Sequence, residues 1–182
     1  TRFVFPMFSL EGTRLWILGM SPLGLNRVVI QKWVQAVIFT GTLTTGLQLL
    51  SGWMLGLSRT DILFFSSAVG LMSMGLCGIA VGLGALFPNL KETNAAKIVS
   101  GFGGTLCLIV SFCYIGTLVS ILCLAKLVVF KTKGLSGHVS GTEGLLGLSV
   151  ACAIVATIIF GGVPMFLAMR RVKRLQMLGP LQ

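Results

Sequence analysis

The chain has 182 residues, of which 55% are hydrophobic and only 10% are charged, and its mean hydropathy is +0.98. Soluble domains usually carry about 25% charged residues, so this composition excludes an ordinary soluble globular protein. The formal net charge of +10 would suit nucleic acid, but the basic residues lie between long apolar stretches rather than in a soluble basic domain. We therefore expect a polytopic membrane protein that has no nucleic-acid partner.

The first 32 residues mix apolar side chains with charged ones. Residues 3–8 are apolar, and we expect them to be the tail of an earlier hydrophobic helix. Residues 9–32 are too charged to cross a bilayer and too apolar for a free linker, which predicts an amphipathic helix on the cytoplasmic membrane surface. We therefore separate residues 1–32 from a transmembrane domain formed by residues 33–182.

Four long stretches without charge follow, at residues 33–58, 62–90, 98–125 and 144–169. A membrane-spanning helix needs about 20 mostly apolar residues, so each stretch is long enough to cross with some tilt. No stretch alternates strictly between apolar and polar residues, which argues against a barrel. The sequence thus predicts an all-α membrane protein with four transmembrane helices, at about 34–57, 62–87, 98–125 and 145–169.

The basic residues predict the orientation of these helices. With four spans both ends of the chain share one side of the membrane, and that side holds ten of the 14 Lys and Arg residues. Cytoplasmic loops carry the excess of basic residues, so we expect both termini in the cytoplasm and the chain in the cell (inner) membrane. The basic cluster after the last span is expected to anchor at anionic headgroups: Arg170, Arg171, Lys173 and Arg174. Residues 126–143, which end in a Gly- and Ser-rich stretch, would lie outside.

Glycine is abundant, and two pairs have the GxxxG spacing, Gly52 with Gly56 and Gly78 with Gly82. This spacing places two residues without side chains on one helix face, so that another helix can approach closely. These four glycines are our candidates for helix packing. Packing within one subunit and packing between two subunits both remain open.

Motifs for chemistry are sparse. The phosphate-loop pattern GxxxxGK[ST] does not occur, and the glycines at 101, 103 and 104 lack the GxGxxG spacing. If ATP drives this protein, we therefore expect another chain or a further region to bind it, and no cofactor in this chain. The five cysteines fall inside the predicted spans without a CxxC pair, which favours packing roles over a metal site.

Two functions that differ from that of an ATP-driven protein remain open. Residues 134–137 read GLSG, which matches the GxSG of rhomboid proteases, but Ser136 lies in a polar loop and the only histidine, His138, is two residues away. Nucleophile and base therefore lack the arrangement of that family, and we expect no catalytic residue and no enzyme activity. A structural or assembly subunit of a membrane complex is equally compatible with glycine-rich spans.

Two segments carry a family resemblance: FPMFSLEGTRLWILGMSPL at residues 5–23 and GLGALFPNLKETNAAKIVSGFGGT at residues 82–105. They resemble the permease subunit of ABC-2-type transporters, in particular the bacterial ABC exporter group. The resemblance implies that the four spans correspond to the last four helices of a six-helix permease. It also implies a permease homodimer or heterodimer that exports an unknown substrate and is driven by separate ATP-binding cassette subunits.

The same resemblance implies which residues contact the ATPase. In such permeases a coupling helix lies between the second and third helices, and residues 9–23 occupy that position here. The resemblance implies coupling contacts from this segment and from the second cytoplasmic loop: Glu11, Arg14 and Trp16, and Asn89, Lys91 and Glu92.

Overall fold

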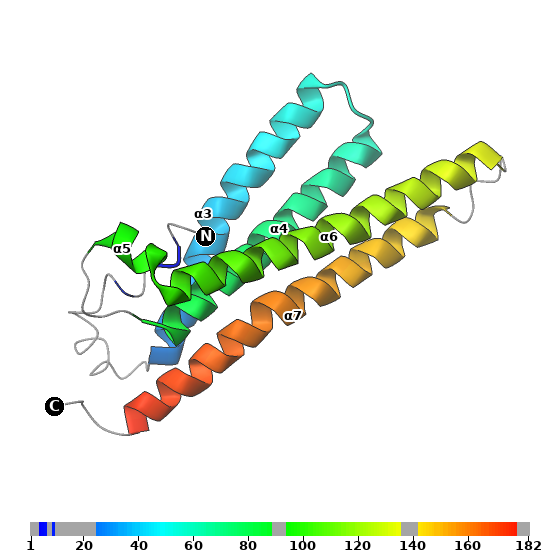
Figure 1. Ribbon diagram of the computed structural model, residues 1–182. Coiled ribbons are helices and arrows are strands. Elements are labelled where there is room, and N and C mark those ends of the chain that lie inside the picture. The colour runs from blue at the N-terminus through cyan, green and yellow to red at the C-terminus, as the bar shows by residue number, and fades with distance from the viewer. Residues whose placement is uncertain (1–3, 7–8, 10–24, 89–93, 136–141, 178–182) are drawn as a thin grey trace.

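A computed structural model describes residues 4–6, 9, 25–88, 94–135 and 142–177 (Figure 1). Every regular element within these ranges is an α-helix, which confirms the all-helical prediction. The elements, in chain order, are α3 (Leu25–Met54), α4 (Arg59–Leu86), α5 (Ala95–Ser100), α6 (Phe102–Leu135) and α7 (Thr142–Met177).

Helix α4 lies at the centre of the bundle and contacts α3, α6 and α7 (Figure 1). Its C-terminal half is almost continuously buried from Ser73 to Ala85, because neighbouring helices cover it on several sides. The short α5 packs on the beginning of α6. The four long helices run alternately in opposite directions, so the α3–α4 turn and the end of α6 lie toward the same end of the bundle.

The largest group of buried side chains joins α4, α6 and α7 with the first residues of the chain. Residues 4–6 form a turn rather than the helix tail that we expected, and Phe5 is buried. Its backbone and ring lie close to Gly84 and Gly103, where a Cβ atom would come within 2.6 Å and 3.1 Å of Phe5 atoms. Two positions without side chains therefore make room for this segment.

Three helices are long and apolar enough to cross a membrane, over Arg59–Leu86, Phe102–Val129 and Gly147–Arg171. These correspond to the second, third and fourth predicted spans. Helix α3 is long enough, with 30 residues, but it is not among them. Its middle contains two glutamines and four threonines, which reduce its hydropathy: Gln35, Thr40, Thr42, Thr44, Thr45 and Gln48.

Two predicted boundaries of the third span, 98–125, were wrong. Ile98 lies in α5, and Gly101 interrupts the helix with an extended backbone before α6 begins at Phe102. The Asn94 side chain accepts a hydrogen bond from the Ala96 backbone N–H at 3.0 Å, so local capping fixes where α5 starts. At the other end α6 continues to Leu135, although residues 126–143 were expected to form an external segment.

The predicted division between residues 32 and 33 does not coincide with an end of a helix. Helix α3 begins at Leu25 and continues through Lys32 and Trp33 without interruption. The expected amphipathic helix falls mainly on residues 10–24, which lie outside the described residues. Helix α7 likewise continues to Met177, beyond the last predicted span of 145–169.

Candidate functional site

The residues that the family resemblance proposed for contacts with an ATPase lie outside the described residues. These are Glu11, Arg14, Trp16, Asn89, Lys91 and Glu92. Ser136 and His138, from the protease alternative, lie outside them as well. Pro88 and Asn94 are the described residues on either side of residues 89–93. Both lie at the end of the bundle where α4 ends and α6 begins.

Gly78 and Gly82 lie where α4 crosses α7. A Cβ atom at Gly78 would be 3.0 Å from the Cα atom of Gly161, and one at Gly82 would be 2.7 Å from the backbone nitrogen of Met165. The second contact is at Pro164, which lies inside α7. Because the obstructing atoms belong to the backbone, side chains at these two positions would push the helices apart.

The pair Gly52 and Gly56 is arranged differently. Gly52 faces α4, where a Cβ atom would meet the Ile62 side chain at 3.1 Å. Gly56 lies beyond the end of α3, in the turn to α4, and has a positive φ of 65° that favours glycine. Nothing lies within 4 Å of a Cβ atom there, so Gly56 serves the turn and not a helix face.

The basic residues at the end of α7 interact with the bundle. The guanidinium of Arg171 donates a hydrogen bond of 2.7 Å to the backbone carbonyl of Leu86, and it lies 5.9 Å from the Phe87 ring. Arg170 lies over the Phe166 ring, 4.3 Å from its centre. Helix ends leave backbone carbonyls without helical partners and carry partial negative charge, so Arg171 caps the C-terminus of α4. The sequence pattern did not indicate this contact.

Tyr114, the only tyrosine in the chain, joins three helices at the centre of the bundle. Its side chain is fully buried on α6, and its hydroxyl donates to the Leu71 carbonyl of α4 at 3.1 Å. The same hydroxyl lies 2.9 Å from the Thr157 hydroxyl of α7. A Cβ atom at Gly75 would overlap the Tyr114 ring and hydroxyl, so Gly75 makes room for it. In the sequence, the feature that could have indicated this role is a single phenol side chain within an apolar stretch.

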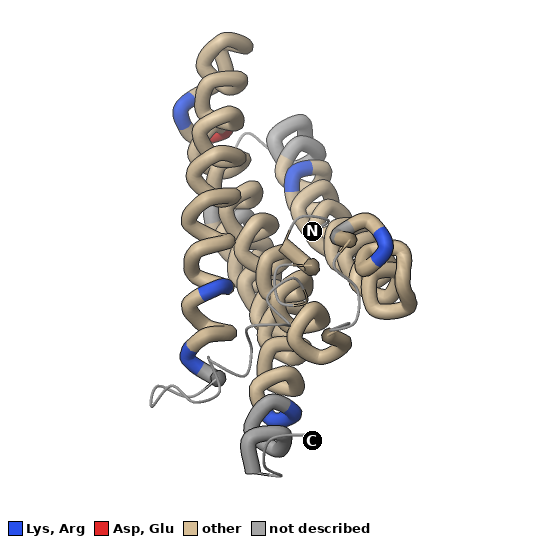
Figure 2. The backbone as a smooth tube through the Cα atoms, turned by 90° about the vertical axis from the view of Figure 1, so that its left-hand side faces the viewer, with Lys and Arg blue, Asp and Glu red and all other residues tan. Residues whose placement is uncertain are grey.

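An ion pair joins α4 and α6 toward the opposite end of the bundle. The ammonium of Lys126 contacts the carboxylate of Asp61, and it also lies 4.7 Å and 5.4 Å from the ring centres of Phe64 and Phe65. Asp61 is the only acidic residue whose side chain belongs to the described part, and Figure 2 shows it as the single red segment. In the sequence, Asp61 and Lys126 only mark ends of uncharged stretches. The sequence pattern did not predict that these two residues form an ion pair.

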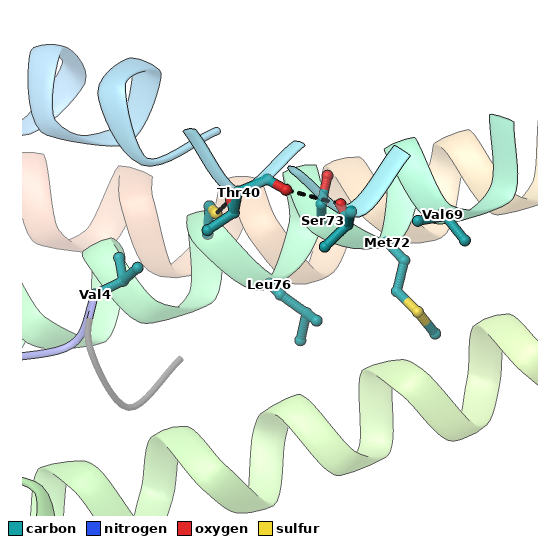
Figure 3. A pocket seen from close by; sticks show the side chains of 8 residues that line it. Val4, Thr40, Val69, Met72, Ser73 and Leu76 are labelled. Carbon is teal, nitrogen blue, oxygen red and sulfur yellow. Dashed lines mark hydrogen bonds between the residues drawn. The ribbon is translucent and has the colours of Figure 1, made fainter. Parts of the chain in front are cut away.

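Two cavities lie along α4 in the space between α3 and α6. The larger, of about 450 Å³, is lined by residues of α4 and α6 and by Gln48 of α3. The smaller, of about 230 Å³, lies between α3 and α4 and is lined by Val4, Thr40 and Cys77 among others. Figure 3 shows Met72 and Leu76 of α4 pointing from this cavity toward α6. Both cavities are lined mainly by apolar side chains.

The cysteines are free thiols, and the Thr40 hydroxyl lies 3.1 Å from the Cys77 sulfur. Cys77 and Cys107 are buried, whereas three others are exposed: Cys113, Cys123 and Cys152. Among the side chains that the structure describes, no group of three metal-ligating residues is close enough to hold an ion.

One family model matches residues 1–177, and its description reads "Putative ATP-binding cassette". Neither the curated proteins nor the solved structures contain a match to the chain. The description refers to ATP binding and does not name a permease. It therefore corrects the assignment of this chain as an ABC-2-type permease that moves a substrate, and it gives no better support to the assembly or protease alternatives.

The matched region extends over almost the whole chain. The match associates the chain with an ABC transporter, and the three apolar helices indicate association with a membrane. The chain belongs to the family described as an ATP-binding cassette.

Proposed function

We propose that the chain forms the membrane-embedded helical part of an ATP-binding cassette complex. The observation that carries the proposal is that the family match and the apolar helices occur in the same residues. The family match covers residues 1–177, and these residues include three helices long and apolar enough to span a bilayer. The outward faces of α6 and α7 support it, because large apolar side chains such as Phe112 and Ile158 are exposed there.

Helix α3 is our proposed fourth span. Its threonine hydroxyls donate to carbonyls one turn earlier in the same helix, for example Thr42 to Ile38 at 2.6 Å and Thr44 to Thr40 at 2.8 Å. Polar groups satisfied within a helix are tolerated in lipid. Its outer face also carries large apolar side chains, and Phe39 is 70% exposed. A water-exposed helix of this kind would be unfavourable, whereas a lipid-facing one is expected.

We further propose that both ends of the chain are cytoplasmic and that the complex lies in the cell membrane. The excess of basic residues where α3 begins and α7 ends, compared with the end that holds Arg59 and Lys126, supports this orientation. Contacts with the ATP-binding part would then involve Glu11, Arg14 and Trp16 together with Asn89, Lys91 and Glu92, all of which lie outside the described residues.

We place the nucleotide and its hydrolysis outside these 182 residues, in a partner subunit or a further region. The sequence has no GxxxxGK[ST] loop, which would hold the phosphates between a strand and a helix. The second candidate function is nucleotide binding by this chain itself. It is favoured by the family description, which refers to ATP binding.

Photolabelling with 8-azido-ATP distinguishes the two candidates. The complete chain would be isolated from membranes together with any copurifying ATP-binding protein, and would also be labelled alone. We expect the chain to remain in the membrane pellet after alkaline carbonate extraction and the label to appear on the partner. Labelling of the chain itself that unlabelled ATP displaces would establish the second candidate, and extraction by carbonate would contradict the membrane placement.

A further inference from the structure

The two cavities beside α4 adjoin one another. Val69 and Met72 line both of them, so the two cavities lie next to each other along α4, the smaller toward α3 and the larger toward α6. We call the two cavities together the α4 groove. Along its length it is lined mainly by apolar side chains, and in Figure 3 Met72 and Leu76 extend into the space between α4 and α6. The larger cavity alone, about 450 Å³, is within the range of small-molecule sites.

One end of the α4 groove is charged. Lys126 lines the larger cavity and pairs with Asp61, and both side chains remain accessible, with exposed fractions of 33% and 37%. Gln48 of α3 also lines this cavity and adds an amide. The end of the groove therefore offers a positive group, a negative group and an amide, while its length offers apolar surface.

The α4 groove is longer than the hydrocarbon part of one lipid leaflet. Asp61 is in the first turn of α4 and Cys77 is 16 residues further along, which corresponds to about 24 Å of helix axis. The hydrocarbon core of a bilayer is about 30 Å thick and one leaflet supplies about half of that, so an acyl chain that follows one leaflet would find room along the groove. Because α4 is a candidate span that begins at Arg59, the ion pair lies near the level of the lipid headgroups.

From this arrangement we propose that the α4 groove binds one acyl chain of a zwitterionic glycerophospholipid with a primary ammonium, such as phosphatidylethanolamine. The phosphate would lie against Lys126, and the ammonium would donate hydrogen bonds to the Asp61 carboxylate. Such charge-assisted hydrogen bonds are stronger than neutral ones. A purely anionic headgroup would place its charge beside Asp61, and a choline headgroup lacks N–H donors. This proposal does not depend on how the complex uses ATP.

Native mass spectrometry of the complete chain tests the proposal. The protein in detergent would be offered phosphatidylethanolamine, phosphatidylcholine or phosphatidylglycerol separately. We expect phosphatidylethanolamine to be retained best, and Met72→Trp, which fills the groove where the two cavities meet, to weaken its retention about tenfold or more. Met74→Trp is the matched control, because Met74 is on the same helix but faces outward. It should retain lipid as the unchanged protein does.

A charge variant separates recognition from a loss of structure. Asp61→Asn leaves Lys126 without its carboxylate, so retention should shift from phosphatidylethanolamine toward phosphatidylglycerol. Helical circular dichroism and a single elution peak would verify folding. If Met72→Trp does not fold, Ala68→Leu narrows the larger cavity with a smaller change. Equal retention of all three lipids by every variant would overturn the proposal. So would a chain dimer that Met72→Trp disrupts while no lipid is bound, because a second copy would then occupy the groove.

Discussion

At the scale of single residues, Tyr114 shows how one polar group can connect three apolar helices. Its hydroxyl contacts a carbonyl of α4 and a hydroxyl of α7 from its position on α6. The Thr157 hydroxyl also lies 2.8 Å from the Ala153 carbonyl, so each of the two hydroxyls can donate its one proton either to a carbonyl or to the other hydroxyl. In lipid, water does not compete for these groups, and the network fixes how the three helices are rotated relative to one another.

Replacing Tyr114 by phenylalanine tests this network. Hydrogen bonds between membrane helices contribute about 0.6 kcal/mol on average and up to about 1.7 kcal/mol, so we expect Tyr114→Phe to lower stability by about 1 kcal/mol. Thermal unfolding in detergent would measure it. Thr117→Val is the control on the same helix, because the exposed Thr117 hydroxyl bonds only to the Cys113 carbonyl of its own helix. Equal effects of both variants would contradict a role for the Tyr114 network.

The glycines of α4 also act one residue at a time. A Cβ atom at Gly82 would approach the backbone of Pro164 and Met165 to less than 3 Å. Overpacking costs about 1–3 kcal/mol, so Gly82→Ala should destabilise the chain by an amount in this range, as measured by thermal unfolding. At Gly46 of α3 nothing lies within 4 Å of a Cβ atom. Gly46→Ala should therefore be neutral or stabilising, since alanine favours helix by about 0.5–1 kcal/mol. If Gly46→Ala lowered stability and Gly82→Ala did not, the close contact of Gly82 with α7 would be refuted.

At the scale of elements, the contact between the end of α4 and the side of α7 depends on Arg171. The hydrogen bond to the Leu86 carbonyl ties the end of α4 to a residue of α7 that is 85 positions further along the chain. It adds a structural role to a basic residue that we had expected to act as a membrane anchor. Arg170, its neighbour, instead packs over Phe166 within its own helix.

The pair of adjacent arginines provides a matched comparison. A positive charge at a helix C-terminus contributes about 0.3–1 kcal/mol at exposed sites, so Arg171→Gln should be less stable than Arg170→Gln by about that amount. Both variants lose one positive charge, which makes their effects on membrane anchoring similar. Hydrogen exchange at the last turn of α4 would locate the change, and faster exchange there is expected only for Arg171→Gln. Identical exchange in both variants would show that the cap has no effect.

At the scale of the whole molecule, the number and direction of membrane crossings can be tested directly. We expect four, with the α3–α4 turn outside and the α4–α5 end inside. In a chain whose five native cysteines are replaced by serine or alanine, Ser58→Cys should react with a membrane-impermeant maleimide in intact cells. Asn94→Cys should react only after permeabilisation. Reaction of both cysteines in intact cells, or of neither, would mean that α4 does not cross as proposed.

Composition and charge spacing determined much of the architecture from the sequence. Ionised groups are costly in hydrocarbon, so the gaps between charged residues located the apolar parts of α4, α6 and α7. The ends of helices were less accurately predicted. Charges such as Lys126 and Lys131 do not terminate a helix, so α6 extends past them, whereas an uncharged glycine at 101 does interrupt the chain. Hydropathy ranks residues by solvation, but helix ends depend on backbone hydrogen bonding and capping.

The contacts between helices were decided only by the tertiary structure. Sequence spacing indicated that Gly78 and Gly82 share one helix face, but only the fold places that face against Pro164 of α7. The pairing of Asp61 with Lys126, the contacts of Tyr114 and the cap formed by Arg171 join residues that are 43 to 85 positions apart. Periodicity within one helix gives the direction of each side chain relative to its own axis. It gives no information on which helix lies opposite, because that depends on how all the helices pack together.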